Sequence, residues 1–401
     1  MKIIERPDYL NRLKLLKDTP DIKILTGIRR CGKSKLLAAF IDWLLKSDAN
    51  CNVIFIDFAL LSNEHLKEYH ALNEYVTDRY DSSKNNYLCI DEVQMCPHFE
   101  LAINSLYSTG NFDIYLTGSN AFLLSSDLAT LFTGRFIEIP VFPFSFKEFC
   151  DYFEISDGFQ NAFDNYVTFG GLSGSYPYKS EEDRCAYIKD VYNTIVKRDL
   201  IDRYKLSAAT DLTKVLEYMM DNTSNICSPN SIASSLTSGG MPTCNKTIES
   251  YLEYLCHAFV LYKVKRYDIR GKKYLQSLDK YYLADSGIRY AMLGRRNMDW
   301  GRIYENIVCI ELKRRGFDIY VGKLYQKEID FVAMKGDKKI YIQVSDDISN
   351  PQTFEREYSP LLQIKDGYPK TIIARTHKPR YDYFGIEIVD IAEWLSTVSL
   401  R

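Results

Sequence analysis

One segment constrains the fold of this chain more than any other. Residues 27–34 read Gly27-Ile28-Arg29-Arg30-Cys31-Gly32-Lys33-Ser34 and fit the pattern G-x-x-x-x-G-K-[S/T]. An apolar run typical of a strand precedes the segment (Ile22–Thr26), and a helical run follows it (Lys35–Leu45). In such a strand–loop–helix, backbone N–H groups of the loop and of the helix N-terminus face bound phosphates. Lys33 then reaches the β- and γ-phosphates and Ser34 ligates Mg²⁺, so the segment predicts a binding site for ATP or GTP.

The length and composition of the chain limit the classes to which it can belong. A chain of 401 residues exceeds the size at which one core usually keeps growing, which favours two or three domains. The net charge of −2 gives no general attraction to nucleic acid, so such contact needs a local basic patch. Because there is neither a membrane-length apolar run nor a signal peptide, we expect a cytoplasmic protein without a membrane partner. The ten cysteines include no C-x-x-C pair, which favours reduced thiols over disulfides or a zinc site.

The first part of the chain has the pattern of an α/β domain. Helical runs separate five expected strands: Ile22–Thr26, Asn52–Asp57, Tyr87–Asp91, Asp113–Thr117 and about Phe136–Ile139. This alternation predicts a parallel sheet with helices on both faces. Residues 144–225 read as largely helical, with one long helix from Ser180 to Arg203. We therefore place an ATPase core with a helical extension at residues 1–225.

Two further domains are expected after residue 225. Between residues 226 and 298, two helices and a turn precede two strands, at about Val260–Arg266 and Lys273–Leu283. Helix–turn–helix followed by a hairpin is the layout of a winged helix. Residues 299–401 read as a small α/β domain. Its expected elements are a helix at Arg302–Arg315 and strands at Asp318–Gly322, Glu328–Met334 and Lys339–Val344.

A second motif points to hydrolysis as well as binding. The apolar run Tyr87–Ile90 ends in two adjacent carboxylates, Asp91 and Glu92. Asp91 is suited to hold the Mg²⁺ shell, and Glu92 is suited to polarise the attacking water as general base. Adjacent strand residues point to opposite faces, so the two acids share a site only if the strand ends there. Val93-Gln94 and Pro97 indicate that it does.

Other polar residues are candidates for the same site. A further strand ends in Gly118-Ser119-Asn120, where ligands bind in open α/β sheets. Ser119 or Asn120 could sense the γ-phosphate or orient the water, and either could instead cap the next helical run. Arg135 could stabilise transition-state charge in its own subunit or in a neighbouring one of a homo-oligomer, and the loop arginines are alternatives.

Seven segments together carry a family resemblance. They are Thr26–Ser34, Ile90–Gln94, Leu116–Asn120, Thr133–Arg135, Lys280–Gly287, Tyr304–Asn306 and Lys327–Phe331. In these segments the chain resembles, over essentially its whole length, the prokaryotic AAA-type (P-loop) ATPases with a C-terminal restriction-endonuclease-like domain of unknown function. The resemblance implies an ATPase core, a winged-helix unit and a nuclease-like terminal fold, with ATP rather than GTP as the nucleotide.

The nuclease-like site is expected to be incomplete. An endonuclease of that fold needs a carboxylate on a helix, an Asp on a strand, and an acid and a Lys on the next strand. Glu305 and Asp330 supply the first two, but Gln343 and Ser345 stand where the acid and the Lys belong. Neutral Gln ligates a hard cation more weakly than a carboxylate does. We expect a binding or structural fold without catalysis, with a metal-dependent nuclease as the alternative.

A basic cluster marks the expected hairpin. It comprises Lys263, Lys265, Arg266, Arg270, Lys272 and Lys273. On a winged helix these residues could grip DNA phosphates, and otherwise they form a solvated hairpin or a face that docks a protein. The leading hypothesis is an ATP-hydrolysing enzyme coupled to DNA or another nucleic acid. The alternative is a nucleotide-dependent switch that regulates protein partners without contacting DNA.

Overall fold

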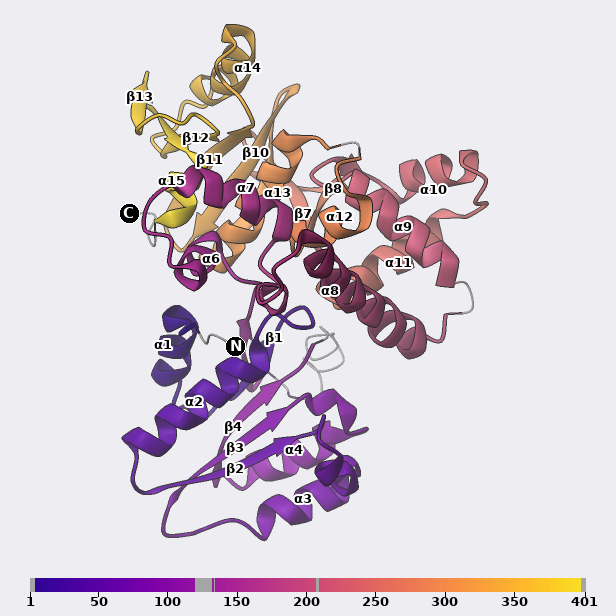
Figure 1. The fold of residues 1–401 in the computed structure, drawn as a ribbon, viewed down its shortest axis with the longest axis vertical. Coiled ribbons are helices and arrows are strands. Elements are labelled where there is room, and N and C mark those ends of the chain that lie inside the picture. The colour runs from indigo at the N-terminus through magenta and orange to yellow at the C-terminus, as the bar shows by residue number, and fades with distance from the viewer. Residues whose placement is uncertain (1–3, 120–131, 133, 207–208, 297, 398–401) are drawn as a thin grey trace. The chain divides into compact units, whose positions relative to one another are not determined.

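The computed structural model describes residues 4–119, 132, 134–206, 209–296 and 298–397 (Figure 1). The chain divides into two compact units. The N-terminal unit comprises residues 3–141 with 257–259, and the C-terminal unit comprises the rest from residue 142 onward. Asn120, Thr133 and the expected helix at 121–131 lie outside the described residues.

The N-terminal unit contains the predicted parallel sheet. Its five strands lie in the order β2-β3-β4-β1-β5, and every neighbouring pair is parallel. The strands are β1 (Ile22–Thr26), β2 (Cys51–Asp57), β3 (Asn85–Asp91), β4 (Phe112–Thr117) and β5 (Phe136–Pro140). Because all five run the same way, residues that follow β1, β2, β3 and β4 meet at one edge of the sheet. This arrangement confirms the prediction of a parallel α/β core.

Helices cover both faces of this sheet (Figure 1). They are α1 (Pro7–Leu15), α2 (Lys33–Ser47), α3 (Tyr69–Thr77) and α4 (Phe99–Ser108), with 3-10 helices at Leu61–Lys67 and Val93–Met95. On one face, apolar residues of α3 and α4 such as Leu72 and Ile103 join alternate strand residues such as Ile24 in one buried cluster. On the other face, the ring of Phe40 from α2 lies 4.6 Å from that of Tyr115 in β4.

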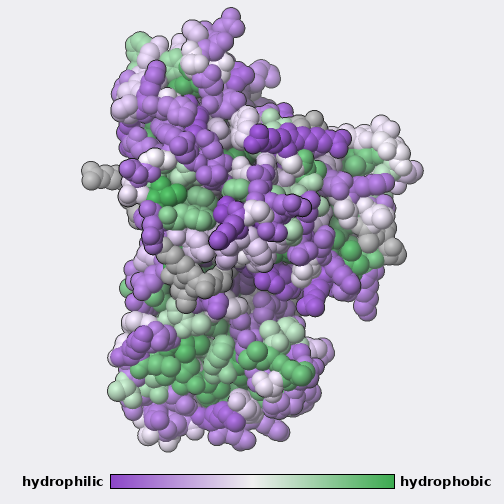
Figure 2. Space-filling model, viewed as in Figure 1, coloured by the Kyte–Doolittle hydropathy of each residue, from purple (hydrophilic) through white to green (hydrophobic). Residues whose placement is uncertain are grey.

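The N-terminal unit also exposes apolar side chains, and Figure 2 shows a broad apolar area on the visible face of this unit. The large exposed apolar residues of the unit include Leu45, Phe55, Leu60, Leu61, Met95 and Leu101. Phe55 lies on β2, which is an edge strand, and is 46% exposed. Large contiguous apolar areas on a soluble protein mark interaction surfaces.

A mixed nine-stranded sheet forms the centre of the C-terminal unit. Its order is β13-β14-β12-β11-β10-β9-β7-β8-β6. The strands are β6 (Ile226–Cys227), β7 (Leu261–Asp268), β8 (Lys273–Leu283), β9 (Asp318–Leu324), β10 (Lys327–Lys335), β11 (Lys338–Ser345), β12 (Lys370–Ala374), β13 (Tyr381–Tyr383) and β14 (Ile386–Asp390). Buried and exposed residues alternate in β7, where Val264 is buried between exposed Lys263 and Lys265, whereas β11 and β12 are buried almost throughout. The alternation fits a strand covered on one face, and the continuous burial fits strands covered on both faces.

The helices of this unit are distributed along its whole sequence. They are α6 (Phe146–Phe153), α7 (Phe159–Phe169), α8 (Glu181–Thr194), α9 (Ala209–Asp221), α10 (Pro229–Ser238), α11 (Asn245–His257), α12 (Ser286–Leu293), α13 (Trp300–Arg314), α14 (Pro351–Leu362) and α15 (Ile391–Ser396). The predicted long helix at 180–203 is α8 continued by a π-helix at Ile195–Asp202.

The two units differ from the three expected segments, because long-range contacts join residues 142–225 to the rest of the C-terminal unit. The buried carboxylate of Asp285, which caps α12, accepts hydrogen bonds from the N–H groups of Gly171 (2.5 Å) and Gly287 (2.9 Å). The approach is so close that a Cβ on Gly170 would lie 1.9 Å from Asp285 Oδ1. The start of α12 is thereby held against the loop that follows α7.

The sheet likewise crosses the expected boundary at residue 298. β7 pairs with β8 as the predicted hairpin, and it also pairs in parallel with β9. The helices α10 and α11 precede the β7–β8 hairpin in the order that the sequence predicts, and β6, which was not predicted, pairs with β8. The hairpin and the terminal strands therefore share one sheet. The winged-helix and nuclease-like interpretations stay predictions.

Candidate functional site

The loop at residues 27–32 is shaped by two glycines. It leaves β1 at the carboxyl edge of the sheet, and α2 begins at Lys33. Gly27 has φ of 137°, and a Cβ there would lie 2.0 Å from the backbone oxygen of Val141. Gly32 has φ of 104° and is the N-cap of α2. A side-chain-free cap leaves the first N–H groups of α2 for a ligand, which fits an anion such as a phosphate.

The ammonium of Lys33 lies inside this loop. Lys33 is 4% exposed, and its Nζ donates to the backbone oxygens of Gly27 (2.8 Å) and Ile28 (3.1 Å). The loop is further supported by Arg6, whose Nη1 donates to Cys31 O at 3.0 Å. Neutral carbonyl oxygens hold an ammonium more weakly than carboxylates do. The charge of Lys33 is therefore available to phosphate oxygens.

Ser34 and Asp91 come together from two different elements. Ser34 lies on the first turn of α2, and its side chain hydrogen-bonds Asp91, the last residue of β3. Thr117, which ends β4, donates its hydroxyl to Asp91 Oδ1. Burial raises the pKa of Asp91, while the hydrogen bonds from Thr117 and Ser34 lower it. A hydroxyl beside a carboxylate is an oxygen donor set that suits Mg²⁺.

Glu92 shares the edge with Asp91 because the chain turns immediately after β3. Its φ is 54°, in the left-handed region, and its N–H donates to Thr117 Oγ1 at 3.0 Å. The Glu92 carboxylate accepts hydrogen bonds from Gln94 Nε2 and from Ser119 Oγ (3.3 Å). Glu92, Gln94 and Ser119 thus form one polar group at the carboxyl edge, beside Asp91.

The three candidate arginines lie at opposite ends of the strands. Arg135 immediately precedes β5, whose first residue Phe136 is in register with Ile22 at the start of β1. It therefore lies at the edge of the sheet opposite the loop, roughly 16 Å away for a five-residue strand. Its guanidinium lies 5.5 Å from the ring of Tyr107. Arg29 and Arg30 remain in the loop itself, with Arg30 at φ of 65°.

Sequence reasoning did not single out Thr117, Gln94 or Asp57 as members of this site. Thr117 contacts both acids, and Asp57 at the end of β2 is in register with Asp91. Each of the three ends a strand of the sheet or lies within three residues of such an end. That shared position was the available signal.

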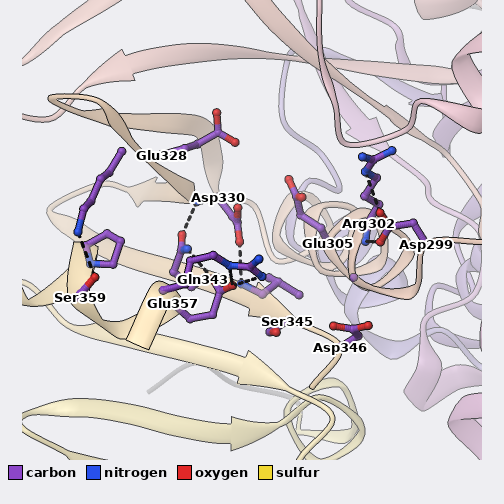
Figure 3. Close-up of a pocket in the computed structure, with 15 residues that line it drawn as sticks. Asp299, Arg302, Glu305, Glu328, Asp330, Gln343, Ser345, Asp346, Glu357 and Ser359 are labelled. Atoms are coloured by element: carbon purple, nitrogen blue, oxygen red, sulfur yellow. Dashed lines mark hydrogen bonds and ion pairs between the residues drawn. The ribbon is translucent and has the colours of Figure 1, made fainter. Parts of the chain in front are cut away.

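A second polar site is a cavity of about 480 Å³ in the C-terminal unit (Figure 3). The predicted nuclease-like residues Glu305 (α13), Asp330 (β10), and Gln343 and Ser345 (both β11) all line it. Glu328 from β10 and Glu357 from α14 also line it. The structure therefore brings the predicted residues together and adds four acids to them, since Asp299 and Asp346 line the cavity as well.

These side chains are bonded to one another. Gln343 Oε1 accepts from the N–H of Asp330 (2.7 Å), and Gln343 Nε2 donates to Glu357 (2.8 Å). Asp330 Oδ2 accepts from the N–H of Val344 at 2.8 Å. Burial raises the pKa of Asp330 well above its ordinary value, and the charge of Glu305 raises it further.

Lys280 on β8 was missed as part of this site. Its Nζ lies 2.9 Å from Glu305 Oε1 and 2.7 Å from Glu328 Oε1. Tyr282, two residues along β8, donates its hydroxyl to the same Glu305 oxygen at 2.7 Å. Among the described residues, no group of three or more His, Cys, Asp or Glu is placed to hold a metal ion. The residues of this cavity do not fit the divalent cation that a nuclease-like fold implies.

The predicted basic cluster lies on and beyond β7. Five of its members are exposed: Lys263, Lys265, Arg270, Lys272 and Lys273. Lys263 forms an ion pair with Asp279 (2.9 Å). Two exposed rings accompany the cluster, since Tyr274 and Tyr325 are each 58% exposed and the Arg270 guanidinium lies 5.1 Å from the Tyr325 ring.

Comparison with known proteins places the loop and its acids in a recognised domain. Residues 19–150 match the family described as AAA domain, and residues 160–299 match a domain of unknown function (DUF8612). The first match contains the loop, both acids, Ser119 and Arg135. The N-terminal unit therefore contains most of an AAA domain.

Two relatives match most of the length of this chain. An uncharacterized protein of Haemophilus influenzae is 36% identical over 398 residues, which cover 98% of each chain. An uncharacterized protein of Methanocaldococcus jannaschii is 27% identical and covers 89% of this chain and 82% of its own. The Walker-type ATPase of Pyrococcus abyssi has a TM-score of 0.49 at 16% identity, covering 72% of this chain and 96% of that chain.

None of the helices in the described part of the chain combines the length and the apolar character needed to cross a bilayer.

Proposed function

We propose that this chain, which belongs to the same family as the Haemophilus influenzae protein and contains an AAA-type ATPase domain, hydrolyses ATP with Mg²⁺ and couples hydrolysis to nucleic acid. One observation supports the proposal that the chain hydrolyses ATP. Ser34, Asp91 and Glu92 meet at the carboxyl edge of the sheet, beside the loop that holds Lys33. This edge is where ligands bind in open parallel sheets.

Each residue has a distinct chemical role in this proposal. Gly27 to Lys33 cradle the phosphates with backbone N–H groups and the Lys33 ammonium. Ser34 and Asp91 would hold Mg²⁺, which supplies positive charge against the β- and γ-phosphate oxygens. Glu92 takes the proton of the attacking water. The hydrogen bonds from Gln94 and Ser119 hold the Glu92 carboxylate in one orientation.

The test separates binding from hydrolysis. Lys33→Ala should abolish productive ATP binding. Glu92→Gln should bind ATP and hydrolyse it about 10²- to 10⁴-fold more slowly, because it loses the base and keeps the pocket. Glu74→Gln makes the same change at an exposed position of α3 and should leave turnover unchanged. Wild-type turnover in Glu92→Gln would show that the base is wrongly assigned.

The coupling to nucleic acid rests on the hairpin. Five exposed cations and two exposed tyrosine rings lie on the β7–β8 hairpin and the neighbouring β9–β10 turn. Cations that track a phosphate backbone and rings on which bases stack are the usual components of a nucleic-acid surface. The net charge of −2 makes this local patch the source of any attraction. DNA is the nucleic acid that a winged-helix interpretation favours.

Turnover in the presence of DNA tests the coupling. We expect duplex DNA to raise the rate of ATP hydrolysis, and the effect to fall steeply as salt rises from 50 to 200 mM. A rate that DNA leaves unchanged at every salt concentration would contradict the coupling and favour the nucleotide-dependent protein switch.

We also propose that the chain works as a homo-oligomer. In its own chain Arg135 is at the edge opposite the loop, so it can reach only nucleotide bound by another copy. The exposed apolar residues of the same unit supply a surface that a second copy can cover.

A further inference from the structure

The carboxylates of the C-terminal cavity already have a cation. Lys280 is 3% exposed, and its ammonium lies within 3 Å of one oxygen of Glu305 and one of Glu328. An ammonium is a compact, strongly hydrated point charge, and burying it is costly unless carboxylates compensate. Two of the acids that line the cavity are therefore already paired with a positive charge of the chain itself.

We propose that Lys280 takes the place of a divalent cation beside this cavity, and that without its ammonium the uncompensated negative charge of Glu305, Glu328 and the neighbouring Asp330 attracts one. In the protein as it stands, the cavity then binds no divalent metal, and the ion pairs of Lys280 hold β8 to α13 and β10.

The contacts of the three acids support this assignment. Glu305 Oε1 is shared by Lys280 and the Tyr282 hydroxyl, so it is fully engaged by donors. Glu328 Oε1 is engaged by the same ammonium at 2.7 Å. A divalent cation needs several oxygen ligands at once, and it cannot displace an ammonium that is covalently tethered between them.

Two neighbouring residues, Gln343 and Asp330, likewise bond to protein groups where they would otherwise be available to a metal. Gln343 stands where a second strand acid would ligate the metal, and both ends of its amide are used, one by Asp330 N–H and one by Glu357. Asp330 itself is bonded to the N–H of Val344. Gln343 and one oxygen each of Glu305, Glu328 and Asp330 are thus bonded to other groups of the chain.

Truncating the lysine leaves buried carboxylates without a counter-charge. Hard divalent cations prefer such oxygen sets, so we expect Lys280→Met to bind one Mn²⁺ per chain that the wild-type cavity does not bind. Lys263→Met is the matched control, because Lys263 lies on the same hairpin and is paired with an acid but is 46% exposed. It should bind no more Mn²⁺ than wild type.

The experiment is a Mn²⁺ titration of nucleotide-free full-length protein, followed by electron paramagnetic resonance. The gained site should disappear in Lys280→Met/Asp330→Asn, and also in Lys280→Met/Glu305→Gln, in which the lost positive charge is compensated. A Lys280→Met protein that folds and gains no Mn²⁺ contradicts the proposal. So does a wild-type Mn²⁺ site that Asp330→Asn removes.

Folding itself provides a second measurement. If Lys280→Met unfolds in EDTA, the account expects Mn²⁺ to restore the folded C-terminal unit, with a rise in melting temperature on the order of 5 °C at saturating metal. Failure of Mn²⁺ to stabilise the variant, while Glu305→Gln does restore it, would show that Lys280 only neutralises charge and does not occupy a metal position.

Discussion

Each of the two polar sites contains a buried lysine, but the two lysines are bonded to different kinds of oxygen. At the N-terminal site Lys33 is bonded to the carbonyl oxygens of Gly27 and Ile28. In the C-terminal cavity Lys280 is bonded to the carboxylates of Glu305 and Glu328. Both ammonium groups are buried, at 4% and 3% exposure, so burial does not distinguish them.

The difference lies in what each lysine would lose by taking a ligand. Lys33 would exchange weak bonds to neutral oxygens for charged phosphate oxygens, which favours binding. Lys280 would have to give up two charge-assisted bonds in a low-dielectric site, which opposes it. A buried lysine surrounded by acids is therefore evidence of a closed electrostatic site, even where the residues resemble those of a metal centre.

The largest expected effect concerns Arg135 at the N-terminal site. Arg135→Ala should lower hydrolysis on the order of 10³-fold and leave ATP binding nearly unchanged, because it removes charge that acts only in the transition state. Mixing it with Lys33→Ala protein should restore part of the activity, since each variant supplies what the other lacks. No recovery in a mixture shown to co-assemble would contradict action on a neighbouring subunit.

A smaller effect is expected for the buried ion pairs of the cavity. In EDTA, Lys280→Ala should lower the free energy of unfolding of the C-terminal unit by about 3–5 kcal/mol, because it leaves the buried carboxylate of Glu305 without its counter-charge. Lys263→Ala removes an exposed pair from the same hairpin and should cost at most about 1 kcal/mol. Denaturant unfolding with hydrogen exchange, which reports on each unit, checks both. Equal losses of unfolding free energy in the two variants would contradict the different roles assigned to Lys280 and Lys263.

The hairpin should contribute both to the affinity for duplex DNA at low salt and to the salt dependence of that affinity. Changing Lys265, Arg270 and Lys272 to Ala should reduce the slope of log K against log salt for duplex DNA by about 2.7. A variant with Lys189, Lys214 and Lys378 changed to Ala removes three exposed lysines elsewhere in the unit and is the control. Fluorescence anisotropy at several salt concentrations gives the slope, and identical slopes in the two triple variants would exclude the hairpin as the contact.

The smallest effect is expected where the nuclease-like residues are changed. Asp330→Ala should leave ATP turnover nearly intact, because Asp330 and the nucleotide-binding loop belong to different units of the chain. Wild-type protein with Mg²⁺ or Mn²⁺ should not cut supercoiled plasmid, single-stranded DNA or RNA. Nicking by the wild type that disappears in Asp330→Ala would instead establish a metal-dependent nuclease.

Local patterns predict the N-terminal unit well. The expected strand Ile22–Thr26 is β1 without change, and Tyr87–Asp91 is the C-terminal part of β3. Buried strands of a parallel sheet are continuous apolar runs, which makes them easy to recognise. The loop and the adjacent acids also lie in short contiguous segments. Their meeting at one edge follows from parallel topology alone.

Contacts between distant parts of the chain could not be predicted in the same way. Lys280 and Glu305 are 25 residues apart, and nothing in their local sequence says that they meet. The pairing of β7 with β9 and the bond from Gly171 to Asp285 likewise depend on the packed fold. For this reason the sequence predicts the residues of the cavity but not its resident ammonium.

One titration tests the contrast between the two sites most directly. Mn²⁺ binding to the full-length wild-type protein should be measured with and without a non-hydrolysable ATP analogue, and repeated with Lys33→Ala and Asp330→Asn. The account predicts one Mn²⁺ per chain that appears only with nucleotide, is lost in Lys33→Ala and persists in Asp330→Asn. A Mn²⁺ site that needs no nucleotide and is lost in Asp330→Asn would contradict it.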